Sequence, residues 1–120
     1  MINKNNSNYK DLIDTYNNFL LTNFPKGGYY HKPIGDVWDK LTNYHYQSEV
    51  LFQKLDYGDI NDFSPYDVKI DNELDIIISE IPLEKLNESD KKLLKRYIQI
   101  KKATDEFRKV LKKFIEEEWE

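Results

Sequence analysis

The chain has 120 residues, which is a length typical of one domain (residues 1–120), and it carries a formal net charge of −4 at pH 7. It has no cysteine, so disulfides, thiolate nucleophiles and cysteine-based metal sites are excluded, as suits a reducing compartment. No apolar run approaches the roughly 20 residues of a membrane helix, and the amino-terminal segment lacks the apolar core of a signal peptide, so we expect a cytoplasmic protein without membrane contact.

Two helices are expected in the first half of the chain. Asn8 is a suitable cap for the first, and apolar side chains follow it at helical spacing as far as Leu20. The stretch 23–36 is rich in glycine and proline and predicts a loop. Asp36 is the expected cap of the second helix, whose apolar positions continue to Leu55.

The third element has two interpretations. Ser64 followed by Pro65 is a helix-start signature, and apolar residues continue at helical spacing as far as Pro82. The same apolar residues also fit the alternation of a β-strand, with one gap. We expect a helix over residues 66–81 and keep the strand as the alternative.

The last helix has the clearest pattern. Asn87 or Ser89 is its expected cap, and the residues that follow are spaced 4-3-4-3-4-3, which is a heptad seam over three repeats. The seam consists of Leu93, Tyr97, Ile100, Thr104, Phe107, Leu111 and Phe114. Together the four segments predict an all-α fold, a small four-helix domain with a long carboxyl-terminal helix.

The length of this last helix suggests a binding surface. A straight helix over residues 88–119 would span about 48 Å, whereas a compact domain of this size has a diameter of about 35 Å. Either the first helix or the amino-terminal arm covers its apolar end, or a partner does, a second copy of the chain being one such partner. The candidate partner-binding residues are Phe114, Ile115, Trp119, Tyr29 and Tyr30.

Charge is distributed unevenly along the chain. Residues 56–90 hold two basic and eleven acidic side chains, whereas residues 91–113 hold ten basic and two acidic ones. Five lysines of the last helix fall within an arc of about 40° opposite the seam and are candidates for contact with a nucleic-acid backbone. These are Lys91, Lys95, Lys102, Lys109 and Lys113.

The competing interpretation of these lysines is an ordinary solvated helix face. Asp105 lies four residues from both Lys101 and Lys109, and Glu106 lies four from Lys102, so ion pairs along the helix would partly neutralise the row. The chain also contains only two arginines, the residue best suited to bidentate phosphate recognition. The acidic block is likewise either a surface for a basic partner or a solvated region.

Patterns for catalysis and for metal binding are missing from the sequence. The aspartate-rich stretch 56–67 does not match the ligand positions of an EF-hand loop. His45 and Glu49 are four residues apart and would suit an acid–base or metal pair, but a surface hydrogen bond is the default expectation. There is no glycine-rich phosphate loop and no serine nucleophile elbow. We therefore expect no enzyme activity, no cofactor and no metal.

These features favour a small, non-catalytic protein-interaction module. As a class preference, we expect an inhibitor of a larger nucleic-acid-handling protein, of the phage anti-defence, immunity or antitoxin type. Its partner would then be a protein or a ribonucleoprotein. The alternative is a nucleic-acid-binding regulator that uses the basic face of the last helix.

Overall fold

The computed structural model describes residues 7–21, 34–57 and 68–118. Within these ranges the chain forms four α-helices, one short 3-10 turn, η3 (Leu83–Lys85), and no strand. The helices are α1 (Ser7–Leu20), α2 (Ile34–Tyr57), α3 (Asn72–Ser79) and α4 (Glu88–Glu118). The all-α fold with a long carboxyl-terminal helix is therefore confirmed.

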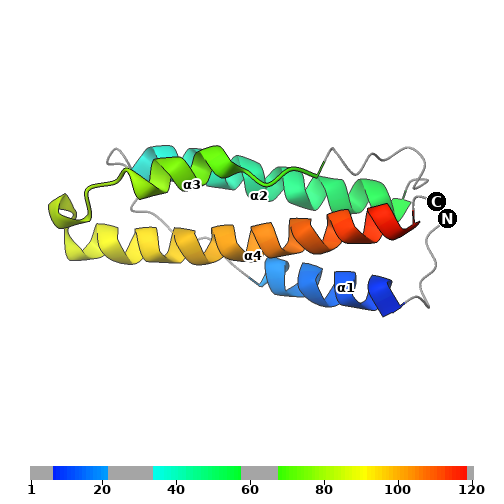
Figure 1. The fold of residues 1–120 in the computed structure, drawn as a ribbon. Coiled ribbons are helices and arrows are strands. Elements are labelled where there is room, and N and C mark those ends of the chain that lie inside the picture. Colours follow the sequence, from blue (N-terminus) through cyan, green and yellow to red (C-terminus); the bar gives the residue numbers. More distant parts are fainter. Residues whose placement is uncertain (1–6, 22–33, 58–67, 119–120) are drawn as a thin grey trace.

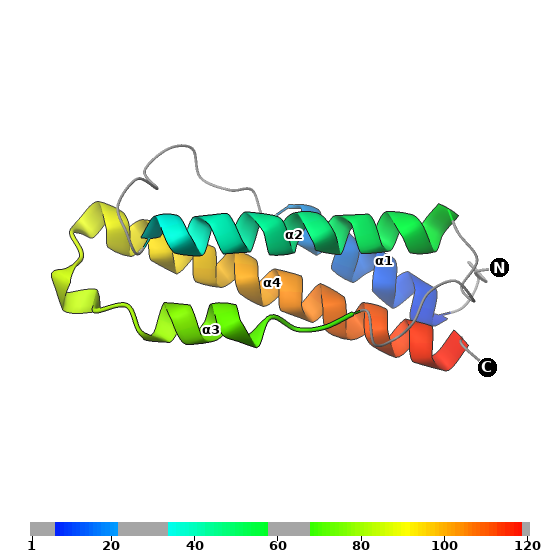
Figure 2. The same ribbon diagram turned by 90° about the horizontal axis from the view of Figure 1, so that it is seen from above.

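Two long helices run the length of an elongated molecule. In Figures 1 and 2, α2 and α4 run in the same direction, and the shorter α1 and α3 run in the opposite one. Of the two short helices, α1 lies along the carboxyl-terminal half of α4 and α3 along the amino-terminal half, so each level of the molecule contains α2, α4 and one short helix (Figure 2). The molecule measures 50 × 23 × 18 Å, and its long axis accommodates the roughly 46 Å of α4.

Buried apolar side chains form two clusters, one at each end of α4. The carboxyl-terminal cluster consists of Leu12, Phe19, Phe52, Leu55, Val68, Phe107, Leu111, Phe114 and Ile115. The amino-terminal cluster consists of Ile34, Val37, Leu41, Tyr44, Leu74, Ile81, Leu94, Tyr97 and Ile100. Both long helices contribute to both clusters, whereas α1 contributes only to the first and α3 only to the second.

The heptad seam of α4 faces these two clusters as predicted. Six of its seven residues are buried and Leu93 is half-buried. Thr104 fits into the seam because its hydroxyl donates to the carbonyl oxygen of Ile100 at 2.8 Å, which satisfies the polar group within the helix. The helix is continuous, and α1 covers its apolar carboxyl-terminal half. Of the two alternatives for the apolar end of this long helix, the structure thus shows the first, which was cover by the first helix.

The start of α3 differs from the prediction. Residues 68–71 are not helical, and the helix begins only at Asn72. Its cap is Asp71, whose Oδ1 accepts a hydrogen bond from the backbone N–H of Leu74 at 3.0 Å. The expected start at Ser64 and Pro65 lies outside the described residues. The strand alternative is wrong for Asn72–Ser79, and a helix over the whole of 66–81 is wrong as well.

Of the caps predicted for the two long helices, the one for α2 is wrong and the one for α4 is correct. The α2 helix already begins at Ile34, so that Asp36 lies in its first turn instead of capping it. At the start of α4, Asn87 behaves as expected, because its side-chain oxygen accepts from the backbone N–H of Asp90 at 2.7 Å.

Candidate functional site

A layer of buried polar residues separates the two apolar clusters. Ser48 of α2 and Thr104 of α4 are fully buried, and Lys101 and Arg108 of α4 are only 2% and 5% exposed. We call these four residues, together with Tyr44 and Asp105, the polar layer. Buried charged groups need hydrogen-bond partners, so the geometry of this layer shows how the chain provides them.

Arg108 connects three segments of the chain. Its Nε donates to the Ser48 hydroxyl at 2.6 Å, Nη1 to the Lys69 carbonyl at 2.8 Å, and Nη2 to the Tyr44 carbonyl at 3.4 Å. The guanidinium also lies 4.3 Å from the centre of the Tyr44 ring. Burial lowers the pKa of Arg108, while Tyr44, Asp71 and Asp105 act in the opposite direction. All three hydrogen-bond acceptors of this arginine are uncharged.

Lys101 and Tyr44 share the carboxylate of Asp105. The ammonium of Lys101 lies 2.6 Å from Asp105 Oδ2 and 3.2 Å from Asp75, and the Tyr44 hydroxyl donates to Asp105 Oδ1 at 2.6 Å. Burial and then the hydrogen bond to Asp105 raise the pKa of Tyr44, which keeps its hydroxyl protonated. These contacts join α2, α3 and α4, and they place no activated nucleophile or base at an open site.

The burial of Lys101 and Arg108 was not predicted from the sequence. Both were counted only among the ten basic residues of 91–113. Their spacing, however, places them seven residues after Leu94 and seven before Ile115, respectively, and all four positions are buried. This second buried row, one position after the seam, was the available signal.

The five lysines that we call the basic row are all exposed: Lys91, Lys95, Lys102, Lys109 and Lys113. The expected ion pairs along α4 form only in part. Asp105 pairs with the buried Lys101, and Lys91 lies 3.5 Å from Glu88. Among the residues that the structure describes, Lys95, Lys102 and Lys109 have no ion pair. The row therefore keeps most of its charge on the surface.

The candidate partner-binding residues of α4 lie in the core. Phe114 is 1% exposed and Ile115 is fully buried, and the Phe114 ring packs 5.9 Å from the ring of Tyr9 in α1. The expectation of exposed apolar surface at these two positions does not hold, because α1 docks on this face of α4. Trp119, Tyr29 and Tyr30 lie outside the described residues.

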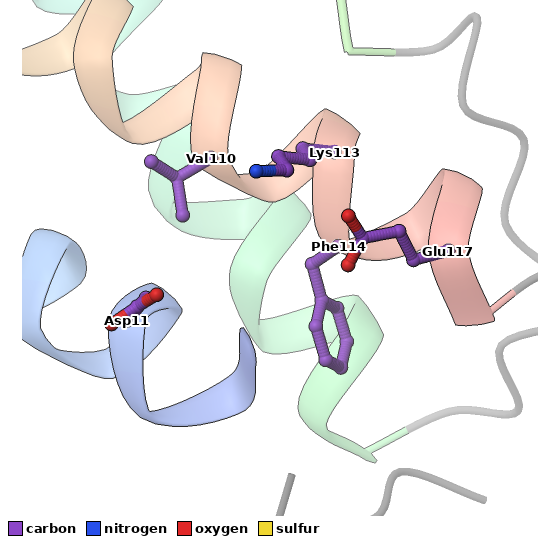
Figure 3. A pocket seen from close by; sticks show the side chains of 5 residues that line it. All are labelled: Asp11, Val110, Lys113, Phe114 and Glu117. Carbon is purple, nitrogen blue, oxygen red and sulfur yellow. The ribbon is translucent and has the colours of Figure 1, made fainter. Parts of the chain in front are cut away.

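A small pocket marks the place where α1 meets the end of the basic row. In Figure 3, Asp11 approaches from α1, and the other lining residues, Val110, Lys113, Phe114 and Glu117, come from α4. Its volume is about 90 Å³, well below the roughly 300–1,000 Å³ of typical small-molecule sites. The pocket is too small to hold a cofactor or a substrate of that size.

His45 packs against aromatic core residues. Its ring stacks on Phe19 with the ring centres 4.1 Å apart, and burial lowers its pKa while Glu49 acts to raise it. Within the described ranges, no three histidine or carboxylate side chains lie together as a metal ion would require. None of the described helices combines the length and the apolar character needed to cross a bilayer.

Comparisons of the chain with protein-family models, with curated proteins and with solved structures find no match.

Proposed function

We propose that the chain is a non-catalytic binding protein whose basic row contacts the phosphate backbone of a nucleic acid. The observation that supports this proposal is the contrast between the two sides of α4. One side is buried along its whole length, and the other presents five exposed lysines. From Lys91 to Lys113 the row extends about 33 Å on one continuous helix.

Such a row binds a polyanion mainly by releasing its condensed counterions. Binding should therefore weaken steeply as salt is added, with log K falling by about 0.7 to 0.9 per unit of log salt for each phosphate contacted. Fluorescence anisotropy with a labelled single-stranded oligonucleotide and with a duplex, each at several salt concentrations, measures this slope. A slope near zero for both probes would rule out backbone contact by the row.

A charge-reversal variant tests which lysines are responsible. Lys95, Lys102 and Lys109 are replaced together by glutamate, and we expect oligonucleotide binding to be lost. A matched control replaces Lys10, Lys85 and Lys92, three exposed lysines outside the row, and changes the net charge by the same amount. Equal losses in the two variants would show a general effect of net charge and would contradict the proposal.

A second candidate function is a protein-interaction module of the inhibitor type. Tyr46, Val50 and Tyr57 are 65%, 39% and 88% exposed, and they lie on one side of α2 within an arc of about 40°. Exposed apolar rows of this kind are typical of protein contacts. The acidic block adds exposed carboxylates at α3 and η3, among them Glu80 and Glu84, which would suit a basic target.

The two candidates are separated by capture from the native host with and without nuclease. A protein target held by α2 should be retained after nuclease treatment and should be lost when Tyr46 and Tyr57 are replaced by serine. A target held through nucleic acid should show the opposite behaviour, with loss after nuclease and sensitivity to the charge reversal of the basic row.

A further inference from the structure

A groove beside the polar layer has a strongly basic lining. It has a volume of about 450 Å³ and lies between residues 68–72 and the carboxyl-terminal half of α4. Its basic lining residues are Lys69, Arg108, Lys109 and Lys112. The remaining described lining residues are Val68, Ile70 and Asn72, so the part of the lining that the structure describes contains no carboxylate. Two separate segments of the chain therefore bring four cationic side chains to one depression.

Arg108 donates no hydrogen bond to a carboxylate, although Asp71 and Asp105 lie near enough to act on its pKa. Its three acceptors are the Ser48 hydroxyl and two backbone carbonyls, all of them uncharged. The carboxylate of Asp105 accepts instead from Lys101 and Tyr44. A buried cation is ordinarily paired with an anion, because removal from water is unfavourable for an isolated charge.

Arg108 also retains donors for another acceptor. A guanidinium carries five N–H groups, and three hydrogen bonds are formed within the chain. The fold holds this side chain at 5% exposure between α2 and residues 68–71, so its position is fixed before any ligand arrives. Fixed charge-assisted donors are the feature that phosphate-binding sites share.

We propose that this groove binds a phosphate group, with Arg108 in its wall and Lys69, Lys109 and Lys112 around it. The proposal goes beyond nucleic-acid binding by the basic row, because a free phosphate would bind here whether or not a nucleic acid is the partner. Lys109 belongs to both surfaces, so a phosphate of a bound backbone is a second source of the same chemistry.

Titration with inorganic phosphate tests the proposal. Two-dimensional NMR monitors the titration, and chloride is exchanged for phosphate so that the ionic strength stays constant. We expect saturable shifts of the backbone amides of residues 68–72 and 108–112. Replacing Lys69 and Lys112 by glutamine should weaken phosphate binding about tenfold, as expected for the loss of charge-assisted contacts. The matched control, Lys85→Gln with Lys92→Gln, removes the same charge from exposed positions outside both the groove and the basic row, and it should leave the affinity unchanged.

Two results would overturn the proposal. Shifts that spread over all lysine-bearing surfaces without saturating would mean an adventitious ion only. Equal affinity in the Lys69/Lys112 variant and in the control would place any bound phosphate elsewhere. Both substituted groove lysines lie outside the buried core, and circular dichroism will verify that the variant folds.

An oligonucleotide arm separates the two sources of phosphate. If the groove variant loses inorganic phosphate and also weakens oligonucleotide binding, the natural ligand is a backbone phosphate. If it loses inorganic phosphate alone, the ligand is a free phosphate or a small phosphorylated molecule. Failure of the basic row would instead appear as oligonucleotide binding that charge reversal of Lys95 and Lys102, two row lysines outside the groove, does not change, while the unsubstituted chain still binds inorganic phosphate.

Discussion

The two halves of the molecule are built on the same pair of long helices but are covered differently. The carboxyl-terminal half is covered by the 14 residues of α1, and its cluster is rich in stacked aromatic rings, with Tyr16 and Phe52 only 3.8 Å apart between centres. The amino-terminal half is covered by the 8 residues of α3, its cluster is mostly aliphatic, and Ile76 and Leu83 beside it remain exposed. The difference indicates that the carboxyl-terminal half contributes more to stability.

The largest effect is expected from removing a central ring of the carboxyl-terminal cluster. Phe107 is fully buried and its ring lies 4.9 Å from that of Phe19 and 5.3 Å from that of Tyr16. Phe107→Ala should lower the free energy of unfolding by about 4 kcal/mol. Leu74→Ala, in the amino-terminal cluster, should lower it by about 2 to 3 kcal/mol. Urea unfolding measures both, and an equal or larger loss for Leu74→Ala would contradict the comparison.

The polar layer is expected to be the next most sensitive region, because it joins the two halves. Arg108→Ala removes the donor to the Ser48 hydroxyl and to the Lys69 carbonyl, whereas the Tyr44 carbonyl still accepts from the Ser48 hydroxyl. The substitution should lower the free energy of unfolding by about 3 kcal/mol. Arg108→Met keeps most of the side-chain volume and should lower the free energy of unfolding by less than Arg108→Ala does. The neighbouring exposed Lys109→Ala serves as the control, with an expected change within about 0.5 kcal/mol.

This prediction would fail if Arg108→Ala were as mild as the control. Amide hydrogen exchange provides a second test. If the polar layer couples the two halves, the amides of α3 should exchange faster in Arg108→Ala, whereas those of α1 should not. Exchange that rises equally in both helices would show that the molecule unfolds as one unit.

The sequence predicts what depends on local pattern and misses what depends on distant partners. The seam from Leu93 to Phe114 was readable because each residue's burial follows from its position on one helix face. The row Leu94, Lys101, Arg108 and Ile115 could have indicated the burial of the two cations, but not their partners, since Asp75 of α3 and Ser48 of α2 are distant in the chain.

The same reason explains the error at α3. Both Ser64 and Asp71 are good helix caps, so local preference could not choose between them. Residues 68–71 are not helical in the structure, and there the Lys69 carbonyl accepts a hydrogen bond from Arg108, a residue 39 positions away in the chain. The basic row, in contrast, was correctly placed on the exposed side, because opposite faces of one helix follow from its periodicity alone.

A smaller effect is expected at alkaline pH, and it should be concentrated in the polar layer. The pKa of Tyr44 is raised in the folded state, mainly by burial, so the unfolded chain loses this proton first as the pH rises above about 10. The contribution of Tyr44 to the free energy of unfolding should therefore be fully present below about pH 10 and fall above it. Tyr44→Phe should reduce this dependence in urea unfolding, whereas the exposed Tyr46→Phe should not. An unchanged pH dependence in Tyr44→Phe would contradict the buried position of this hydroxyl.

The smallest effect is expected at acidic pH, in the carboxyl-terminal half. Burial lowers the pKa of His45, although a hydrogen bond with the Phe19 backbone and the charge of Glu49 act to raise it, so the folded protein binds this proton less readily than the unfolded chain does. The contribution is present above the unfolded pKa of about 6.5 and is lost as the pH falls below it. His45→Phe keeps a ring beside Phe19 but cannot be protonated, and the difference in its urea midpoint between about pH 7.5 and pH 5.5 should be smaller than in the natural chain. An equal difference would assign the acid sensitivity to other groups. A reduced difference in the urea midpoint would show that the carboxyl-terminal half, although it is covered by the longer helix α1, contains an acid-sensitive contact between α1 and α2.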